Sequence, residues 1–529
     1  MAQSNGLAFI FLFAATLAAL ALRLPKLEQR PMHGDEAVHA IKFGALLEKG
    51  FYRYDSFEYH GPTLNYLTLI PARLSSAKKL TEVTELTLRL VPVFFGTLLV
   101  FMPLLLVKEL GKSAAMIAAL LTAVSPAMAY YSRYYIQEML LVCFTFGVIG
   151  CGYRYMQNKN LGWAVATGIF LGLMHATKET CIIAWGAMGL ALFFTFLLAR
   201  RDEGGLHFIT TLKALERRHV IAVLLAAGAV SALFYSSFLT HAQGVADSIL
   251  AYKTYLSRAG HDPVHIHPWH YYLKLLAYFR LGENPFWSEA LILVLAAAGF
   301  IFALKKKRNA DSNLLRFLAF YTLFMTIVYS LIPYKTPWNL ISFLHGMILL
   351  AGAGAVAMAQ MFPAKFARAA VIALMLVGGA HLTWQAYLAN YKYDENPANP
   401  YVYAHPVYDV FTMVTRVEEI ARAHPDSNNL YIQVISPAND YWPLPWYLRA
   451  FTNVGWWQEV DEISPSAPLI LASAKVEPAI MRKLYELPPP GQRPLYVPLF
   501  DGYLEMRPQI EWRGYVRKDL WDKYEASNP

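Results

Sequence analysis

Charged residues are scarce in this sequence. They make up 16% of its 529 residues, while 56% are hydrophobic, whereas an ordinary soluble domain carries about 25% charged residues. The deficit is concentrated in apolar runs close to the roughly 20 residues that cross a bilayer as a helix. This pattern excludes a soluble globular fold and predicts a polytopic α-helical membrane protein.

Cysteine is nearly absent, with only Cys143, Cys151 and Cys181 in the whole chain. All three lie in apolar runs, where cysteine is most simply a small core residue. Their spacing is not that of a metal site, and residues 389–529 contain no cysteine and so do not depend on disulfides. A glycine-rich nucleotide-binding loop is also missing, so no nucleotide cofactor is expected.

Acidic residues are scarce before residue 389 and plentiful after it. Residues 389–529 carry a net charge of −5, whereas the preceding part carries +14. The basic residues lie in separate short loops and form no single stripe, which argues against nucleic acid as a partner. A basic membrane part followed by an acidic tail indicates two compartments.

Apolar runs predict eleven membrane helices. The first run has no Lys or Arg ahead of it and exceeds the apolar core of a typical signal peptide, so we expect it to remain as a helix. The runs are 7–24, 87–107, 114–129, 138–153, 161–176, 181–199, 219–239, 287–304, 315–333, 340–361 and 369–388.

Basic loops set the orientation of these helices. Alternate gaps hold Lys and Arg clusters at 108–112, 154–159, 200–218, 305–308 and 365–368, and such gaps face the cytoplasm. The first outer loop is also basic, but the five gaps outweigh it. We expect an inner-membrane protein with a cytoplasmic N-terminus, a membrane domain over 1–388, and extracytoplasmic loops at 25–86 and 240–286.

The tail over 389–529 is long enough for a small extracytoplasmic domain. Helical spacing appears over 407–424 and 479–487, and buried strands are indicated at 429–436 and 468–473. This alternation favours an α/β sandwich. The segment 440–449 is unusually aromatic.

Carboxylates gather in the first outer loop, at Asp35, Glu36 and Glu58. A carboxylate can accept a proton as a general base, and two or three together can hold a divalent cation. Carboxylates at a membrane boundary suggest a working site. The alternative is that they only cap and solvate the loop.

Cationic residues appear in other outer loops. Arg133 and Glu138 lie in an aromatic segment between two runs, and Lys178 and Lys335 each lie close to the start of a later run. A guanidinium can clamp a phosphate, and lysines at the membrane boundary suit an anionic lipid phosphate. Interfacial anchoring explains the same residues without a ligand.

Histidines cluster in the long outer loop. Their spacing includes His-x-His, which can bind a transition metal, although loop histidines are more often hydrogen-bonded or exposed. They are His261, His265, His267 and His270.

The order of these motifs resembles the lipid-dependent membrane glycosyltransferases of the GT-C fold, notably protein O-mannosyltransferases and lipid A aminoarabinose transferases. Asp35-Glu36 matches the Asp-Glu pair of that family, and Phe57-Glu58-Tyr59-His60-Gly61-Pro62 is similar to its next element. Glu138 stands where Asp is usual, and Tyr59-His60 replaces a basic residue. Lys178, Lys335 and His265 occupy the remaining motif positions.

Whole-chain order and the acidic tail most resemble the subfamily of flippase activity-associated proteins. The segments that carry this closer resemblance are Asp-Glu-Ala-Val-His-Ala at 35–40 and Asp-Tyr-Trp-Pro-Leu-Pro-Trp-Tyr at 440–447.

The resemblance implies inverting transfer of a sugar from a polyprenyl-phosphate lipid to a glycan, lipid or protein acceptor. Asp35 would be the base, with Glu36 and Glu138 also catalytic. Substrate would be held by Glu58, His60, Arg133, Lys178 and Lys335. Asp35, Glu58 and His265 would bind a divalent metal, if one is used. The alternatives are a flippase, or its accessory, for lipid-linked glycans and a glycan-binding subunit.

Overall fold

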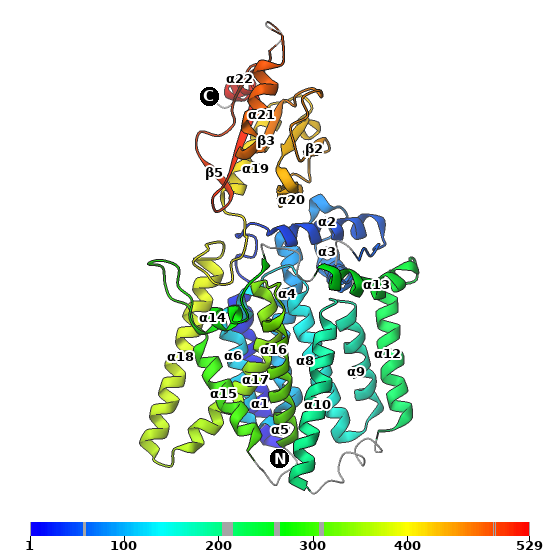
Figure 1. Cartoon of the computed structure of the whole chain (residues 1–529), viewed down its shortest axis with the longest axis vertical. Coiled ribbons are helices and arrows are strands. Elements are labelled where there is room, and N and C mark those ends of the chain that lie inside the picture. Colours follow the sequence, from blue (N-terminus) through cyan, green and yellow to red (C-terminus); the bar gives the residue numbers. More distant parts are fainter. Residues whose placement is uncertain are drawn as a thin grey trace.

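A computed structural model describes residues 2–56, 60–203, 215–258, 265–305, 312–489, 491 and 493–527. A bundle of long helices carries a small α/β domain at one end, and the N-terminus lies at the other end (Figure 1). The predicted topology places the N-terminus and the tail on opposite sides of the membrane. Their positions at opposite ends of the bundle agree with that prediction. Which end is cytoplasmic stays a prediction.

Nine of the eleven predicted apolar runs coincide with one helix each. Run 87–107 continues from a helix through a 3₁₀ turn, and run 114–129 is divided between two helices. Within the described residues, seven helical segments are long and apolar enough to cross a membrane, and four apolar helices are shorter. One of the seven segments consists of α4 with the turn and the short helix that continue it to Leu110. The number that span the bilayer therefore stays a prediction. The bundle helices are α1 (Ala2–Arg23), α4 (Glu85–Phe101), α5 (Val107–Leu110), α6 (Lys112–Val124), α7 (Pro126–Tyr131), α8 (Glu138–Asn158), α9 (Leu161–His175), α10 (Cys181–Glu203), α12 (Arg217–Tyr235), α15 (Ala290–Leu304), α16 (Ser312–Leu331), α17 (Ile341–Met361) and α18 (Lys365–Tyr391).

Close helix contacts in the bundle depend on small residues. A Cβ added to Gly354 of α17 would lie 1.9 Å from the Leu295 carbonyl oxygen of α15, and one added to Gly299 would lie 2.1 Å from that of Leu350. Glycine therefore lets the two backbones touch, as is common between membrane helices, where no hydrophobic force drives association.

The first outer loop contains helices that the sequence did not predict. Helix α2 (Gly34–Lys49) and α3 (Thr63–Leu74) lie across the bundle end beneath the C-terminal domain, near α13 (Gln243–Arg258) (Figure 1). A capping box between His33 and Glu36 begins α2, and Gly50, at φ 78°, ends it. These helices are amphipathic and polar, so a search for apolar runs passes over them. A further short helix, α14 (Tyr271–Ala277), follows in the long loop.

The C-terminal domain is a mixed sheet with helices, as the tail predicts. Its strands run in the order β2-β1-β3-β6-β4, with β5 also paired to β6. Strand β1 is parallel to β2 and β3, whereas β3 and β6 are antiparallel. The elements are α19 (Asp409–Arg422), β1 (Ile432–Ile435), α20 (Leu444–Tyr447), β2 (Val454–Trp457), β3 (Leu469–Ser473), α21 (Glu477–Met481), β4 (Tyr496–Pro498), β5 (Leu504–Arg507), β6 (Ile510–Arg517) and α22 (Lys518–Ser527).

Candidate functional site

Glu36 lies in the first turn of α2 and is fully buried. Its Oε1 accepts hydrogen bonds from Arg89 Nε at 2.8 Å and from the Tyr135 N–H at 2.9 Å. Its Oε2 accepts from Arg89 Nη2 at 2.8 Å, from Arg30 Nη2 at 3.0 Å and from the His33 N–H at 3.0 Å. Burial alone would raise the pKa of this carboxyl, but the two arginines lower it to about 2. Five donors occupy its oxygens, which favours a structural role for Glu36. Its catalytic role stays a prediction.

Asp35, the preceding residue, is placed very differently. Its side chain is 50% exposed, and its backbone N–H donates to His33 Nδ1 at 3.0 Å. Among the described residues no Lys or Arg forms an ion pair with it. The N-terminus of α2 favours its negative charge. Asp35 therefore has a half-exposed side chain on a backbone that is fixed by His33.

His39 lies one turn after Asp35, so both side chains share one face of α2. Gln137 Nε2 is 3.4 Å from His39 Nδ1, and the His39 and His60 rings are 6.2 Å apart. Burial, helped by the neighbouring His60, lowers the pKa of His39 to about 3. This face of α2 thus brings together Asp35 and two of the predicted outer-loop motifs.

Glu138 and Lys178 form a buried ion pair beside this face. Burial lowers the pKa of Lys178, but the Glu138 carboxylate outweighs burial and raises it overall. Glu138 Oε2 and Gln137 Oε1 are buried, and neither has a hydrogen-bond partner within the described part of the chain. A buried acceptor that receives no hydrogen bond lowers the stability of the protein. A bound ligand could supply donors to both atoms. The pair thus joins two predicted site residues and leaves acceptors for a substrate.

His60 is held by a second buried carboxylate that the sequence analysis did not assign. Its Nδ1 lies 2.8 Å from Glu179 Oε2, and the Tyr54 hydroxyl donates to Glu179 Oε1 at 3.0 Å. Burial would raise the pKa of Glu179, but His60 lowers it. Its position directly after Lys178 was a signal that could have identified Glu179.

Lys335 and His265 are joined by a hydrogen bond of 2.8 Å from the Lys335 N–H to the His265 carbonyl. Lys335 Nζ donates to the carbonyls of Ile332 and His267, and no carboxylate pairs with it in the described ranges. His265 Nδ1 lies 2.7 Å from the Tyr403 hydroxyl, and the Tyr403 carbonyl lies 3.1 Å from His33 Nε2. Burial lowers the pKa of Lys335, so an incoming anion would stabilise its charged form.

Arg133 does not have the position that a phosphate clamp requires. Its Nη1 donates to the carbonyls of Arg23 and Pro25 at 3.0 and 2.7 Å, and its Nη2 donates to that of Lys26 at 3.1 Å. The guanidinium therefore closes the end of α1. This use of its donors argues against the predicted substrate contact.

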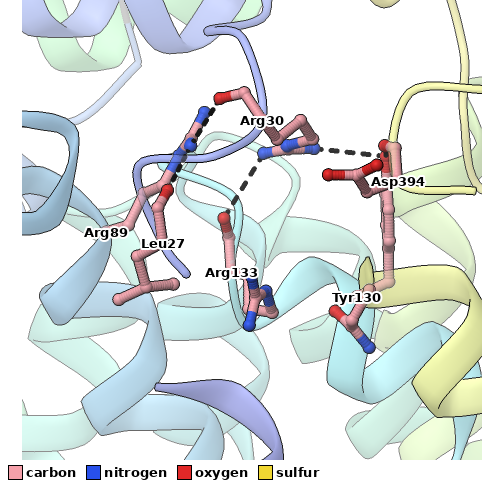
Figure 2. A pocket seen from close by; sticks show the side chains of 7 residues that line it. Leu27, Arg30, Arg89, Tyr130, Arg133 and Asp394 are labelled. Carbon is pink, nitrogen blue, oxygen red and sulfur yellow. Dashed lines mark hydrogen bonds between the residues drawn. The ribbon is translucent and has the colours of Figure 1, made fainter. Parts of the chain in front are cut away.

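Arg133 also borders a small cavity with Arg30, Arg89, Tyr130 and Asp394 (Figure 2). The cavity volume is about 10 Å³, which is near the lower limit for one water. A donor phosphate does not fit there.

The C-terminal domain reaches this site, which the sequence analysis did not foresee. Tyr403 comes from the linker before α19, and the Tyr447 hydroxyl accepts from the Met32 N–H at 2.8 Å. Trp442 lies against Gly34, because a Cβ added to Gly34 would be 3.5 Å from Trp442 Cβ. The aromatic composition of 440–449 was a visible signal, but nothing in the sequence gave its location.

The metal prediction remains open. Glu58, with Phe57 and Tyr59, lies outside the described residues, as does His261. Within the described ranges, no group of three or more His, Cys, Asp or Glu side chains could hold a metal ion. Asp35 and His265 alone therefore do not make a metal site among the described residues.

Residues 68–231 match the family model of dolichyl-phosphate-mannose-protein mannosyltransferases. No curated protein sequence matches the chain. The fold is similar to ArnT from Cupriavidus metallidurans bound to undecaprenyl phosphate, with TM-score 0.61, 14% identity, and coverage of 97% of this chain and 98% of that chain.

A second similar structure is the Archaeoglobus fulgidus oligosaccharyltransferase AglB. In complex with an inhibitory peptide and a dolichol-phosphate, it gives TM-score 0.55 and 15% identity, covering 89% of this chain and 70% of that chain. The form tethered to an acceptor peptide gives TM-score 0.55 and 14% identity over 84% of this chain, which spans only 63% of that chain's length.

These relatives have the GT-C fold, and their low identity makes the likeness one of fold. The closer resemblance to flippase activity-associated proteins stays a prediction. The chain therefore has the GT-C fold of an integral membrane protein, and its membership of the lipid-dependent glycosyltransferases stays a prediction of its motif order.

Proposed function

We propose that this protein transfers a sugar from a polyprenyl-phosphate lipid to an acceptor hydroxyl on the extracytoplasmic side of the inner membrane. The observation that carries the proposal is the contrast between Asp35 and its neighbours. Glu36, Glu138 and Glu179 are buried and paired closely with cationic or imidazole groups, whereas Asp35 is 50% exposed, has no Lys or Arg partner in the described ranges, and lies 4.0 Å from His33 Nδ1. A general base needs such access to its substrate.

Asp35 accepts the proton of the acceptor hydroxyl while that oxygen bonds to the anomeric carbon of the donor sugar. The bond from the anomeric carbon to the phosphate oxygen breaks on the opposite face, and its electron pair leaves with the polyprenyl phosphate. A single displacement of this kind inverts the anomeric centre. The capping box holds Asp35 in place, so little reorganisation is needed.

Lys335 is the cation best suited to the donor phosphate. Lys178 shares its charge with Glu138, and Arg133 donates to main-chain carbonyls, whereas Lys335 has no carboxylate partner in the described ranges. Two similar structures contain a bound polyprenyl-type lipid, undecaprenyl phosphate in ArnT and dolichol-phosphate in AglB. These lipids share the phosphate chemistry that Lys335 would recognise.

Glu138 Oε2 and Gln137 Oε1 suit the hydroxyls of the donor sugar. Both atoms are buried acceptors without described partners, and hydroxyl groups supply the donors that such acceptors need. The Lys178 ammonium pairs with the other oxygen of Glu138. In this proposal Glu138, held by Lys178, accepts hydrogen bonds from the hydroxyls of the sugar. Lys178 itself does not bind the phosphate of the lipid.

The test uses purified protein in lipid nanodiscs with a set of radiolabelled polyprenyl-phosphate sugars. We expect Asp35→Asn to lower release of sugar to water or to a glycan acceptor about 10²- to 10⁴-fold, with unchanged thermal unfolding. Asp247→Asn, the same substitution on α13, is the matched control and should retain activity. A chelator arm decides the metal requirement.

Full activity of Asp35→Asn would exclude Asp35 as the base. A wild-type protein that releases no sugar but speeds the movement of labelled lipid across the bilayer would contradict transfer and support the flippase alternative.

A further inference from the structure

We infer that the C-terminal domain forms one wall of the acceptor site, that Trp442 is the surface on which the acceptor stacks, and that the acceptor is therefore a glycan. This inference rests on the proposed function, because it identifies the acceptor of the same site. It also assigns a task to the acidic C-terminal domain.

The first observation is the position of Trp442. Gly34 and Asp35 are the first two residues of α2, and the Cβ atom of Trp442 would be only 3.5 Å from a Cβ on Gly34. Trp442 is thus packed against the backbone that carries the proposed base. A group bound against Trp442 would therefore lie near the start of α2, of which Asp35 is the second residue.

The second observation is how firmly this segment is attached to the membrane part. Trp446 Nε1 donates to Glu85 Oε1 at 2.8 Å. Arg449 donates to the carbonyls of Val83 at 2.9 Å and Leu80 at 3.2 Å, and its guanidinium lies 3.7 Å from the Trp446 ring centroid. Trp446 and Arg449 come a few residues after Trp442 in the chain, so their contacts fix the distance between Trp442 and α2. A binding surface held by both domains is preorganised.

The third observation is the backbone that leads into Trp442. Ala438 and Asn439 both adopt φ 57°, in the left-handed region that Ala and most other side-chain-bearing residues avoid. Such conformations persist where the surrounding structure needs them, often at ligand sites. Here they turn the chain from β1 so that the aromatic segment faces α2.

The chemistry of Trp442 favours a sugar. The indole is only partly buried, and its N–H has no hydrogen-bond partner in the described ranges. A large aromatic face with an unused donor suits a molecule that is apolar on one face and rich in hydroxyls at its edge. Asp440, which pairs with Arg507 of β5, adds polar groups at the rim.

The experiment measures glycan binding separately from transfer. Full-length protein in nanodiscs is titrated with mannotriose, chitotriose and maltotriose and with a Ser/Thr-containing peptide, and affinity is followed by microscale thermophoresis. We expect one trisaccharide to bind to wild type. Trp442→Ala should weaken that binding at least tenfold, Trp442→Phe should weaken it less, and Asp35→Asn should leave it intact.

Trp521→Ala is the matched control, because Trp521 is also partly buried in the C-terminal domain but packs on the core of α19 and α22. Equal loss of glycan binding in Trp442→Ala and Trp521→Ala would overturn the inference, as would binding of the peptide alone or of no trisaccharide by wild type.

Failure of the proposed function has a different signature. Glycan binding that depends on Trp442, in a protein that releases no sugar from any donor, would refute transfer while upholding the acceptor surface. In an active enzyme, Trp442→Ala should raise the acceptor KM at least tenfold, whereas Trp521→Ala should leave the acceptor KM unchanged.

Discussion

Arg89 and Glu36 face each other through two hydrogen bonds of 2.8 Å, from Nε to Oε1 and from Nη2 to Oε2. This bidentate pair connects α4 to the first turn of α2, and Asp35 is the residue next to it. The buried carboxylate holds the helix in place, and the exposed carboxylate is the base that we propose. Two adjacent acidic residues therefore have opposite tasks.

Replacing Glu36 tests the structural half of this division. Glu36→Gln leaves Arg30 and Arg89 buried without an anion, so we expect the free energy of unfolding to fall by about 3–5 kcal/mol. Thermal unfolding in nanodiscs measures the change. Glu28→Gln, at an exposed position of the same loop, should stay within about 0.5 kcal/mol of wild type. An equally small effect of Glu36→Gln would contradict the assignment.

The pH dependence of Glu36 follows from its lowered pKa. The folded pKa of about 2 lies below the ordinary value of 4.5. Its stabilisation is therefore complete above the ordinary value and is lost as the pH falls towards 2. Glu36 itself should add no slope to stability between pH 5 and pH 8.

The Glu138–Lys178 pair can be tested by a double-mutant cycle. Lys178→Met alone leaves a buried carboxylate unpaired and should destabilise the protein by about 3–5 kcal/mol. Glu138→Gln combined with Lys178→Met removes both charges and should recover most of that loss, while donor turnover stays low. A double variant as unstable as the sum of the single variants would show that the two side chains act independently.

Lys335 should affect the donor rather than the acceptor. Lys335→Met removes a charge-assisted hydrogen bond to phosphate, which is worth about 1.5–3 kcal/mol, so the donor KM should rise about 10- to 100-fold with an unchanged acceptor KM. Lys274→Met, at an exposed position of α14, is the control. Steady-state kinetics at varied donor concentration measure the donor KM. A donor KM equal to that of the control would rule out the phosphate contact.

Arg133 should behave differently from Lys335. Arg133→Gln removes donors from three main-chain carbonyls at the end of α1, and each buried acceptor left unpaired costs about 1–3 kcal/mol. We therefore expect a lower unfolding temperature with an unchanged donor KM in the folded fraction. A raised donor KM at normal stability would restore the phosphate clamp that the sequence suggested.

His39 should make the protein sensitive to acid. Its folded pKa of about 3 lies below the ordinary value of 6.5, because burial, helped by His60, disfavours the charged form. The unfolded chain then binds a proton that the folded chain does not, and stability falls as the pH drops from about 6.5 towards 3. At pH 5 the loss is about 2 kcal/mol. His39→Gln should show a smaller difference in unfolding temperature between pH 7.5 and pH 5, and an identical difference would refute this origin.

Much of the fold could be predicted because apolar runs and basic gaps are local signals. Nine of the eleven predicted runs coincide with one helix each, and the strands expected at 429–436 and 468–473 contain β1 and β3. Helices α2 and α3 were missed, because a helix that lies on the surface of a bundle needs no continuous apolar run.

The sequence by itself determined the membrane class, the order of the motifs and the importance of the segment around Asp35, since each depends on residue type and spacing along the chain. Only the tertiary structure decided that Glu36 is saturated, that Arg133 closes the end of α1 and that Glu179 holds His60. It also brought Tyr403 and Trp442 to His33 and Gly34. Whether a polar side chain is free to bind a substrate depends on hydrogen-bond partners about 50 to 370 residues away in the chain. No local sequence pattern encodes such contacts.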